Sequence, residues 1–403
     1  MRRSFARSGF GVRAGGCPAG QCGDRSGAGR LMAEDRLAAA TDALCAVLRG
    51  EAVDWPPAGD ADFYRALTEQ AAYHGVDALA CHLLKNTPAW DALPAAAREA
   101  LLLRVRQYGA IELVRRHDLE TLLGALQRAG VGVLLLKGAA LAYTLYPEPH
   151  LRARVDTDLF IDTADIGPIK RVFAQRGYDL VGRTYKSHQF NSLRRDLGHG
   201  SINYDVHWRA SNRALYARVI GFEEALRESL ALPGLPWARA LPPPLALLQA
   251  CMHRAANPEH DPNRLVWLYD LHLLASHMDA AQWQSFAQRA VAENLQAICR
   301  DALEAARARF ATALPQAAQA VLASPPRTEG PLQRRLLSSP LGLVLDDLRE
   351  LPDLRARAAL LREYLAPPGA YLLARYGKSG RAWLPWLYLR YLGTGLLARL
   401  TLR

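Results

Sequence analysis

The most constraining feature of this sequence is the change in pattern at Gly130, where helical periodicity gives way to short apolar runs that end at glycine or proline. Before it, stretches such as AAAREALLLRVRQYGAIELVRRHDLETLLGALQRAG place apolar residues three and four positions apart, as amphipathic helices do. After it, VGVLLLKG predicts a buried strand, AALAYTLY a short helix and VDTDLFID a second strand. A strand, a helix and a strand in this order indicate an α/β unit.

The unit continues through a second helix and further strands. ADIGPIKRVFAQRG predicts a helix that ends at Gly177. YDLVGRTYKSHQFNSLRRD and SINYDVHWRA predict strands, which a turn at 197–200 would join as a hairpin. From about residue 213 the pattern is helical again. We therefore expect an α+β or α/β fold class, with a small mixed β-sheet core flanked by N- and C-terminal helical regions.

Shifts in composition divide the 403-residue chain into five parts. We expect a disordered tail or misassigned start, an N-terminal helical region, the core, a helical domain and a C-terminal helical extension, at residues 1–31, 32–125, 126–212, 213–325 and 326–403. The tail is rich in glycine, arginine and serine, a composition also found in organellar transit peptides. A natural start at Met32 is the simpler interpretation, because a helix-like pattern begins there at once.

Charge and cysteine content bear on partners and compartment. The formal net charge of +11 favours acidic partners such as nucleotides, nucleic acid or anionic lipid. The six cysteines show no C-x2-C spacing and no disulfide framework, so we expect a reducing, cytoplasmic environment. No apolar stretch reaches the roughly 18 residues of a membrane-spanning helix. The aromatic, basic segment 383–403 fits either an interfacial membrane helix or, as we favour, a helix docked on the domain.

Three aspartates in the core are the candidate catalytic and metal-binding residues. Asp156 and Asp158 are two residues apart on a predicted strand, so both side chains point to one face. Adjacent carboxylates repel each other unless cations lie between them. Asp205 lies on a later predicted strand, and the three carboxylates converge if the two strands are sheet neighbours. Carboxylate oxygens suit Mg²⁺, and two such ions can clamp an in-line displacement at phosphorus.

The candidate nucleotide-binding residues lie around these carboxylates. Lys137 and Gly138 end the first predicted strand and open a helix, whose N-terminus offers free N–H groups to a phosphate. Arg152 and Arg154 precede the aspartate pair and could neutralise charge on a triphosphate. His207 shares a strand face with the third aspartate, where it could contact a metal, a phosphate or an acceptor.

Each of these features is common by itself. A D-x-D pair also fits a solvated strand face, a Lys-Gly pair an ordinary turn, and a strand histidine a packed side chain at a sheet edge. On later predicted helices, His253, Arg264 and Asp270 could line a nucleotide cleft or include an internal Arg–Asp pair. The order of the core features is more informative than any one of them: strand, Lys-Gly, short helix, arginine, D-T-D on a strand, and aspartate on a later strand.

The stretch LLLKGAALAYTLYPEPHLRARVDTDLFI resembles the signature of an uncharacterised nucleotidyltransferase family within the polymerase-β-like superfamily. That family typically shows L-K-G-x-x-L, then Tyr-Pro, Arg and D-x-D-L, and this chain has matching residues at Lys137, Gly138, Leu141, Tyr146, Pro147, Arg152, Asp156, Asp158 and Leu159. YDVHW and RLVWLYDLHLL resemble the later motifs of the family. The similarity extends from about residue 35 to the C-terminus.

The resemblance implies a metal-dependent transferase that uses an NTP such as ATP as its substrate. It also implies Mg²⁺ as the cofactor, with two ions at the site. Asp156 and Asp158 would hold the metal of the triphosphate, and Asp205 would join them at the second metal. The acceptor would attack the α-phosphorus, and pyrophosphate would leave. Members of the family resemble accessory proteins of polysaccharide or peptide biosynthesis, and the sequence has no RNA-binding signature. We therefore expect a small molecule, sugar, peptide or protein as acceptor and no stable nucleic-acid complex.

One departure from the superfamily pattern concerns the phosphate-binding turn. Most members of the superfamily have Gly-Ser where this chain has Lys137, Gly138 and Ala139. The serine that would contact the triphosphate is absent, which keeps a second interpretation open: a catalytically inactive nucleotidyltransferase-like binding module, at a membrane or away from one. The intact carboxylates favour the enzyme, because a degenerate domain tends to lose buried charges that are costly to keep.

Overall fold

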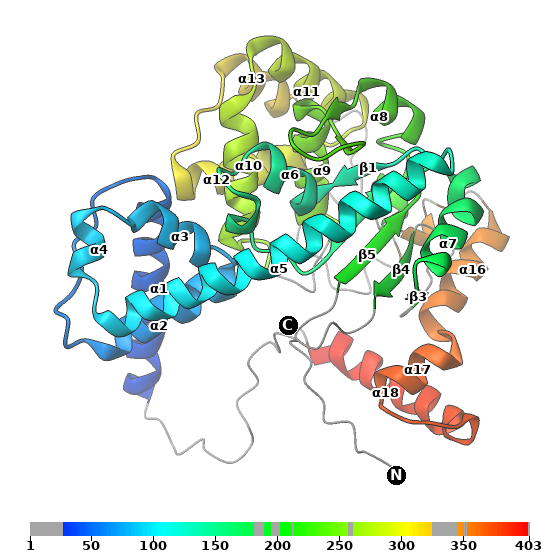
Figure 1. Ribbon diagram of the computed structural model, residues 1–403, viewed down its shortest axis with the longest axis horizontal. Coiled ribbons are helices and arrows are strands. Elements are labelled where there is room, and N and C mark those ends of the chain that lie inside the picture. Colours follow the sequence, from blue (N-terminus) through cyan, green and yellow to red (C-terminus); the bar gives the residue numbers. More distant parts are fainter. Residues whose placement is uncertain are drawn as a thin grey trace.

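A mixed β-sheet packed between helices forms the centre of the molecule (Figure 1). The computed structural model describes residues 27–180, 189–194, 202–211, 213–256, 261–324 and 353–401, together with residues 345, 347–349 and 351. Helical regions precede and follow the sheet along the chain. The expected fold class, a small mixed sheet flanked by helical regions, is confirmed.

The helices before the sheet end in one long element, α5. No proline interrupts residues 95–128, and good helix formers are abundant there, so this stretch forms a single helix of 34 residues. At 1.5 Å per residue it is about 51 Å long. The helices are α1 (Gly27–Leu48), α2 (Ala61–His74), α3 (Asp77–Leu84), α4 (Pro88–Ala92) and α5 (Ala95–Arg128).

The strands follow the order β3-β4-β5-β2-β1-β7-β6 across the sheet. β1 pairs with β2 antiparallel and with β7 parallel, while β2 pairs with β5 parallel. α6 (Lys137–Thr144) follows β1 directly, and α7 (Ile166–Gln175) lies between β2 and β3. The strands are β1 (Leu134–Leu136), β2 (Thr157–Phe160), β3 (Tyr178–Leu180), β4 (Gln189–Arg194), β5 (Ile202–His207), β6 (Leu230–Ala231) and β7 (Arg239–Ala240).

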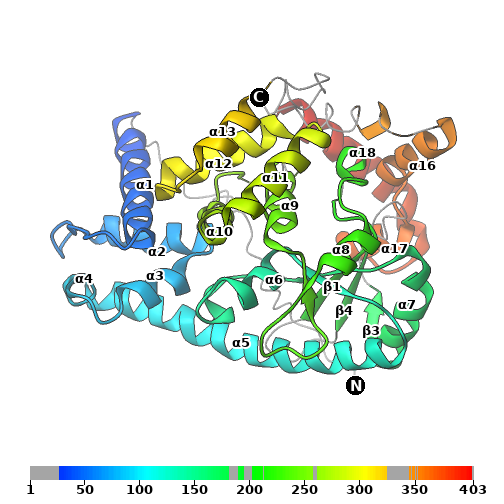
Figure 2. The same ribbon diagram turned by 90° about the horizontal axis from the view of Figure 1, so that it is seen from above.

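Alternate side chains of the central strands enter two different cores. Leu135 and Leu159 pack with α5 and α7 on one face of the sheet. Leu136 and Phe160 pack on the other face, with α6 and α9 (Pro243–Ala256). Figure 2 shows α5 and α9 on opposite sides of the strands. Asp158 is two residues from Phe160, so its side chain lies on the α9 side.

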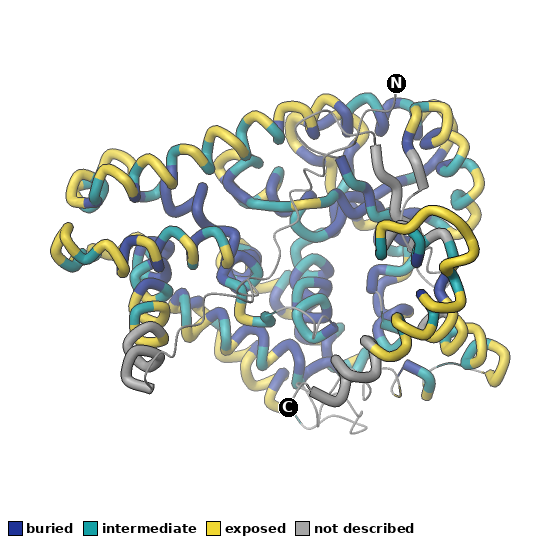
Figure 3. Tube along the Cα trace, turned by 90° about the horizontal axis from the view of Figure 1, so that it is seen from below, coloured by how far each residue is buried: buried dark blue, intermediate teal, exposed yellow. Residues whose placement is uncertain are grey.

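The helices after the sheet continue the second core and then extend beyond it. Figure 3 shows buried segments at the centre of the molecule and exposed ones along the outer helices. No helix in the described ranges combines the length and the apolar content that crossing a membrane requires. The helices are α8 (Phe222–Glu228), α9, α10 (Leu265–His277), α11 (Ala280–Ala292), α12 (Gln296–Phe310), α13 (Gln316–Ala323), α16 (Leu354–Leu365), α17 (Gly369–Arg375) and α18 (Leu384–Thr401).

The C-terminal helix α18 packs on its neighbour α17. Leu387 is fully buried, and the hydroxyl of Tyr388 donates a hydrogen bond of 2.6 Å to the carbonyl of Pro367. On the other side Trp386 is 46% exposed, and Trp383, which lies just before the helix, is 45% exposed. The helix therefore has one packed side and one aromatic side that faces solvent.

Three details differ from the sequence expectations or lie beyond them. β6 and β7 fall in a region predicted to be helical, because two-residue strands are too short to show a period of two. α1 begins at Gly27, so the last residues of the predicted tail are helical. The predicted turn at 197–200 lies outside the described residues.

Candidate functional site

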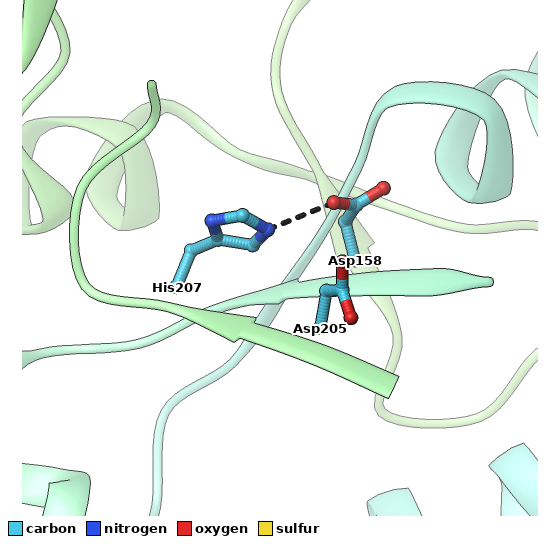
Figure 4. Close-up of side chains that lie close together, drawn as sticks. All are labelled: Asp158, Asp205 and His207. Carbon is cyan, nitrogen blue, oxygen red and sulfur yellow. Dashed lines mark hydrogen bonds and ion pairs between the residues drawn. The ribbon is translucent and has the colours of Figure 1, made fainter. Parts of the chain in front are cut away.

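The register of β2 and β5 places Asp158 beside Asp205. The two strands run parallel, and Asp158 pairs with Asp205 while Phe160 pairs with His207. Potential ligand atoms of Asp158, Asp205 and His207 all lie within 4.8 Å of one another. Figure 4 shows the ring of His207 directed at Asp158, with Asp205 next to it. The strands that carry Asp158 and Asp205 are therefore sheet neighbours, which is the condition on which their predicted convergence depended.

Asp158 is the centre of the contacts in this cluster. The ammonium of Lys137 lies 2.6 Å from its Oδ1, and Nε2 of His207 lies 2.8 Å from the same oxygen. Lys137 reaches it because β1 ends at Leu136, antiparallel to β2 and in register with Asp158. The fold thus brings together Lys137, Asp158 and Asp205 from three separate segments.

Burial and charge set the protonation of these groups. Burial alone would raise the pKa of Asp158, but the charge of Lys137 and the hydrogen bond from His207 hold that pKa well below its usual range. Burial also opposes the charge of Lys137, yet Asp158 and the two neighbouring aspartates raise its pKa above the ordinary value. Burial and the charge of Lys137 lower the pKa of His207. At neutral pH the site therefore holds an ionised carboxylate, an ammonium and a neutral imidazole.

Asp156 lies just before β2 and outside the cluster of three ligand groups. Burial and the charge of Asp158 raise its pKa to about 6. The chain that leads into it is held by Arg115 of α5, whose guanidinium donates to the carbonyls of Arg154 and Val155 at 2.8 and 3.4 Å. Asp156 is thus electrostatically linked to Asp158, and α5 positions the backbone on its N-terminal side.

Arg152 has its guanidinium in a buried ion pair. Its Nε and Nη2 donate to the two carboxylate oxygens of Asp270 on α10, at 3.1 and 2.6 Å. The hydroxyl of Tyr146 donates to the same carboxylate at 2.8 Å. The guanidinium also lies against Gly138, where an added Cβ would be 2.8 Å from Nη1. Arg152 therefore connects α10 to the turn at the start of α6.

Arg154 is also paired with a carboxylate. Its Nη2 lies 2.9 Å from Oε1 of Glu112 on α5, and the hydroxyl of Tyr143 donates to the same oxygen at 2.6 Å. The side chain of Arg154 is 3% exposed. Its Nε and Nη1 are buried and have no hydrogen-bond partner in the described part of the chain.

Sequence reasoning did not identify several residues that shape the site. Glu112 and Gln249 were missed, because their partners lie far away in the chain and no local pattern marks them. The structure pairs Asp270 with Arg152, whereas Arg264 donates to the carbonyl of Tyr73 at 2.8 Å. The expected Arg–Asp pair between the later helices is wrong for Arg264, because Asp270 pairs with Arg152, which lies before β2.

Two further residues from the predicted helices pack together near Arg264. The rings of His253 and Trp267 meet edge to face, with centroids 4.9 Å apart. The guanidinium of Arg264 lies over the ring of Trp267 at 5.8 Å. Both side chains are half-buried, and Trp267 packs against the core of the helical region.

The donor set of the cluster fits a divalent cation. Asp158 and Asp205 offer carboxylate oxygens, which suit Mg²⁺ and Mn²⁺, and His207 offers an imidazole nitrogen. The low pKa of Asp158 and the depressed pKa of His207 keep both groups in the unprotonated form that binds metal. The residues present therefore agree with a metal site at the edge of β2 and β5.

A family described as "Uncharacterised nucleotidyltransferase" matches residues 62–311, a span that contains every residue of the site described above. Among curated proteins, no match was found.

Proposed function

We propose, from the premise that the chain belongs to this uncharacterised nucleotidyltransferase family, that it moves an NMP group from an NTP to an acceptor hydroxyl outside nucleic acid. The observation that carries the proposal is the pairing of Asp158 with Asp205 beside the turn at Lys137 and Gly138. Carboxylates on adjacent strands and a helix N-terminus for phosphate are what such a transfer needs.

The residues of the chain have separate roles in this proposal. Asp158 and Asp205, with Asp156 beside them, would hold two Mg²⁺ ions, and the cluster places His207 close enough to share in that binding. When bound, the metal supplies positive charge to the triphosphate and activates the acceptor oxygen. Lys137 contributes charge to the phosphates, and the N-terminus of α6 contributes N–H groups.

The transfer itself exchanges one bond at phosphorus for another. The acceptor oxygen forms a bond to the α-phosphorus, the bond between that phosphorus and the bridging oxygen of the β-phosphate breaks, and pyrophosphate leaves. The acceptor proton passes to solvent. Arg152 and Arg154 precede Asp156 in the chain, and the charge of Arg152 acts on Asp156. We propose that both guanidinium charges help to neutralise the triphosphate; each keeps a carboxylate partner, Asp270 and Glu112, that fixes its orientation.

Metal-dependent release of pyrophosphate from each of the four NTPs tests the proposal. Small-molecule and protein fractions of a cell extract serve as acceptor sources, and an α-labelled NTP reports which fraction gains the nucleotide. We expect Asp158→Asn and Asp205→Asn to lower turnover by at least about 100-fold, the scale of losing one preorganised electrostatic group. Asp54→Asn, an exposed position outside the family match, is the control. Equal rates in the wild type and both site variants would refute the enzyme.

A nucleotide-binding module without transfer is the second candidate, because of Ala139. This residue is buried and follows Gly138 in α6, so no hydroxyl stands at the second position after Lys137. Calorimetry with ATP and Mg²⁺ separates the two functions. Binding that depends on Asp158, without release of pyrophosphate from any NTP, would favour the module.

The exposed side of α18 supports a proposal about location that is compatible with either function. Trp383 and Trp386 are half exposed, and the guanidinium of Arg390 lies over the Trp386 ring at 5.2 Å. Aromatic and cationic groups on one side of a helix suit the surface of an anionic membrane. We propose peripheral contact through residues 383–403. Sedimentation with phosphatidylserine vesicles tests it: binding that Trp383→Ala/Trp386→Ala does not weaken would contradict it.

A further inference from the structure

Gln249 is a buried polar side chain beside the site to which the proposed chemistry assigns no role. It lies on α9 and is 3% exposed. Its Oε1 accepts a hydrogen bond from the backbone N–H of Lys137 at 3.4 Å, and its Nε2 donates to the carbonyl of Ala210 at 3.3 Å. An amide that is buried without partners is costly, so these two bonds account for its presence in the core.

Gln249 binds the backbone close to the two residues whose side chains contact Asp158. Lys137 is the first residue of α6, and its ammonium lies 2.6 Å from Oδ1 of Asp158. Ala210 follows His207 at the end of β5, and Nε2 of His207 lies 2.8 Å from the same oxygen. Gln249 thus connects the segments that follow β1 and β5, the two strands on either side of β2.

The backbone of Lys137 needs this support. Its φ of +51° lies in the left-handed region, which is unfavourable for a residue with a side chain. Such a conformation persists only where the surroundings hold it. The preceding N-cap residue, Leu136, offers no side-chain hydrogen bond to the start of α6. Gln249 therefore binds the first N–H group of this helix, and in the proposed function the following N–H groups, from Gly138 on, are left for a phosphate.

We propose that Gln249 is a positioning residue for nucleotidyl transfer: it holds the left-handed turn at Lys137 at a fixed distance from the end of β5. This inference rests on the proposed function. An amide is suited to the role because one side chain supplies both an acceptor for Lys137 and a donor for Ala210. Without that link the turn relaxes, and Lys137 loses its fixed place between Asp158 and the phosphates.

Three variants separate positioning from general stability. Gln249→Met has a similar length and removes both hydrogen bonds. Gln249→Glu keeps the acceptor for the Lys137 N–H and loses the donor to Ala210. Gln296→Met is the matched control, because Gln296 is also a buried glutamine, lies on α12, and has an amide with no hydrogen-bond partner in the described residues.

Two measurements are made on each variant. One is kcat and KM for metal-dependent release of pyrophosphate from the NTP that the wild type prefers. The other is the rate at which an amine-specific acylating reagent labels Lys137, followed by peptide mass spectrometry in the full-length protein without nucleotide. The remaining lysines of the chain, Lys85 among them, serve as internal standards. The second measurement does not depend on catalysis.

We expect Gln249→Met to lower kcat by about 10- to 100-fold with a smaller change in KM, the range that misplaced groups cause. Lys137 should be labelled several times faster, and Gln249→Glu should fall between Gln249→Met and the wild type. Gln296→Met should match the wild type in both measurements. Unchanged labelling of Lys137 in Gln249→Met overturns the inference, whatever happens to kcat. A wild type that consumes no NTP refutes the proposed function instead, and the labelling then decides the inference alone.

Discussion

Replacing Gly138 with alanine tests whether the contact between Arg152 and the turn at Lys137 is rigid. Alanine normally stabilises a helix by about 0.5–1 kcal/mol relative to glycine. At Gly138, however, the new Cβ would lie 2.8 Å from Nη1 and 2.9 Å from Cζ of Arg152. Real Cβ atoms essentially never come this close, so either the guanidinium or the backbone of α6 has to move.

The guanidinium of Arg152 cannot move without losing hydrogen bonds. Nε and Nη2 are held by Asp270 at 3.1 and 2.6 Å, and Nη1 donates to the carbonyl of Ala153 at 2.6 Å. Overpacking of this kind costs about 1–3 kcal/mol. Weakening one hydrogen bond to a charged group adds about 1.5–3 kcal/mol. With the gain in helix propensity subtracted, we expect Gly138→Ala to lower the free energy of unfolding by about 3 kcal/mol.

Urea unfolding followed by circular dichroism measures this change, with Gly109→Ala as the control. Gly109 lies within α5, and an added Cβ there meets nothing within 4 Å. That variant should be more stable than the wild type by about 0.5–1 kcal/mol, because only helix propensity changes. If Gly138→Ala were as stable as Gly109→Ala, Arg152 would be free to move aside, and its description as a fixed link between α10 and α6 would be wrong.

Three further predictions concern His74, Asp118 and the metal site. Burial lowers the pKa of His74 from 6.5 to about 4, so the unfolded chain binds more protons than the folded one between these pH values. The free energy of unfolding should therefore be at its full value above pH 6.5 and fall as the pH drops towards 4. Urea unfolding of His74→Gln should show a weaker fall over the same range. In the same assay Asp118→Ala should lower the free energy of unfolding by about 3 kcal/mol, because it removes the acceptor of the buried hydroxyls of Tyr178 and Tyr204, at 2.6 and 2.8 Å. Tyr178→Phe, which removes one of these hydroxyls, should lower it by only about 1 kcal/mol. Millimolar Mg²⁺ should raise the midpoint temperature of thermal unfolding of the wild type and not that of Asp205→Asn, since a ligand that binds only the folded state stabilises it. An equal rise in both proteins would contradict a metal site at this aspartate.

The strands β1, β2 and β5 could be predicted because each is a short run with clear ends, whereas the segment expected as one strand after Gly177 contains two antiparallel strands, β3 and β4. β1 stops at the Lys-Gly turn, and β2 and β5 carry apolar residues around their aspartates. Periodicity of two also gives the face on which Asp205 and His207 lie together. The pairing of Asp158 with Asp205 could be stated only as a condition, because strand order depends on contacts between distant segments.

The contacts that hold the site together come from packing, and a local pattern does not show them. Asp270 lies 118 residues after Arg152, and Gln249 lies 112 residues after Lys137. Each partner is an ordinary residue of an amphipathic helix until the helix is placed against the sheet. The positive φ of Lys137 is hidden for a similar reason, since a lysine gives no sign of left-handed backbone.

The length of α5 determines where this chain can be divided. Glu112, Arg115 and Asp118 lie along the middle of that helix, and their partners include Arg154 and Tyr204 of the core. A fragment that starts at residue 126, where the core was expected to begin, would leave a buried guanidinium and a buried hydroxyl without their acceptors. A fragment that retains the sheet must therefore begin upstream of Glu112. The helix α5 belongs both to the N-terminal helical region and to the packing of the sheet.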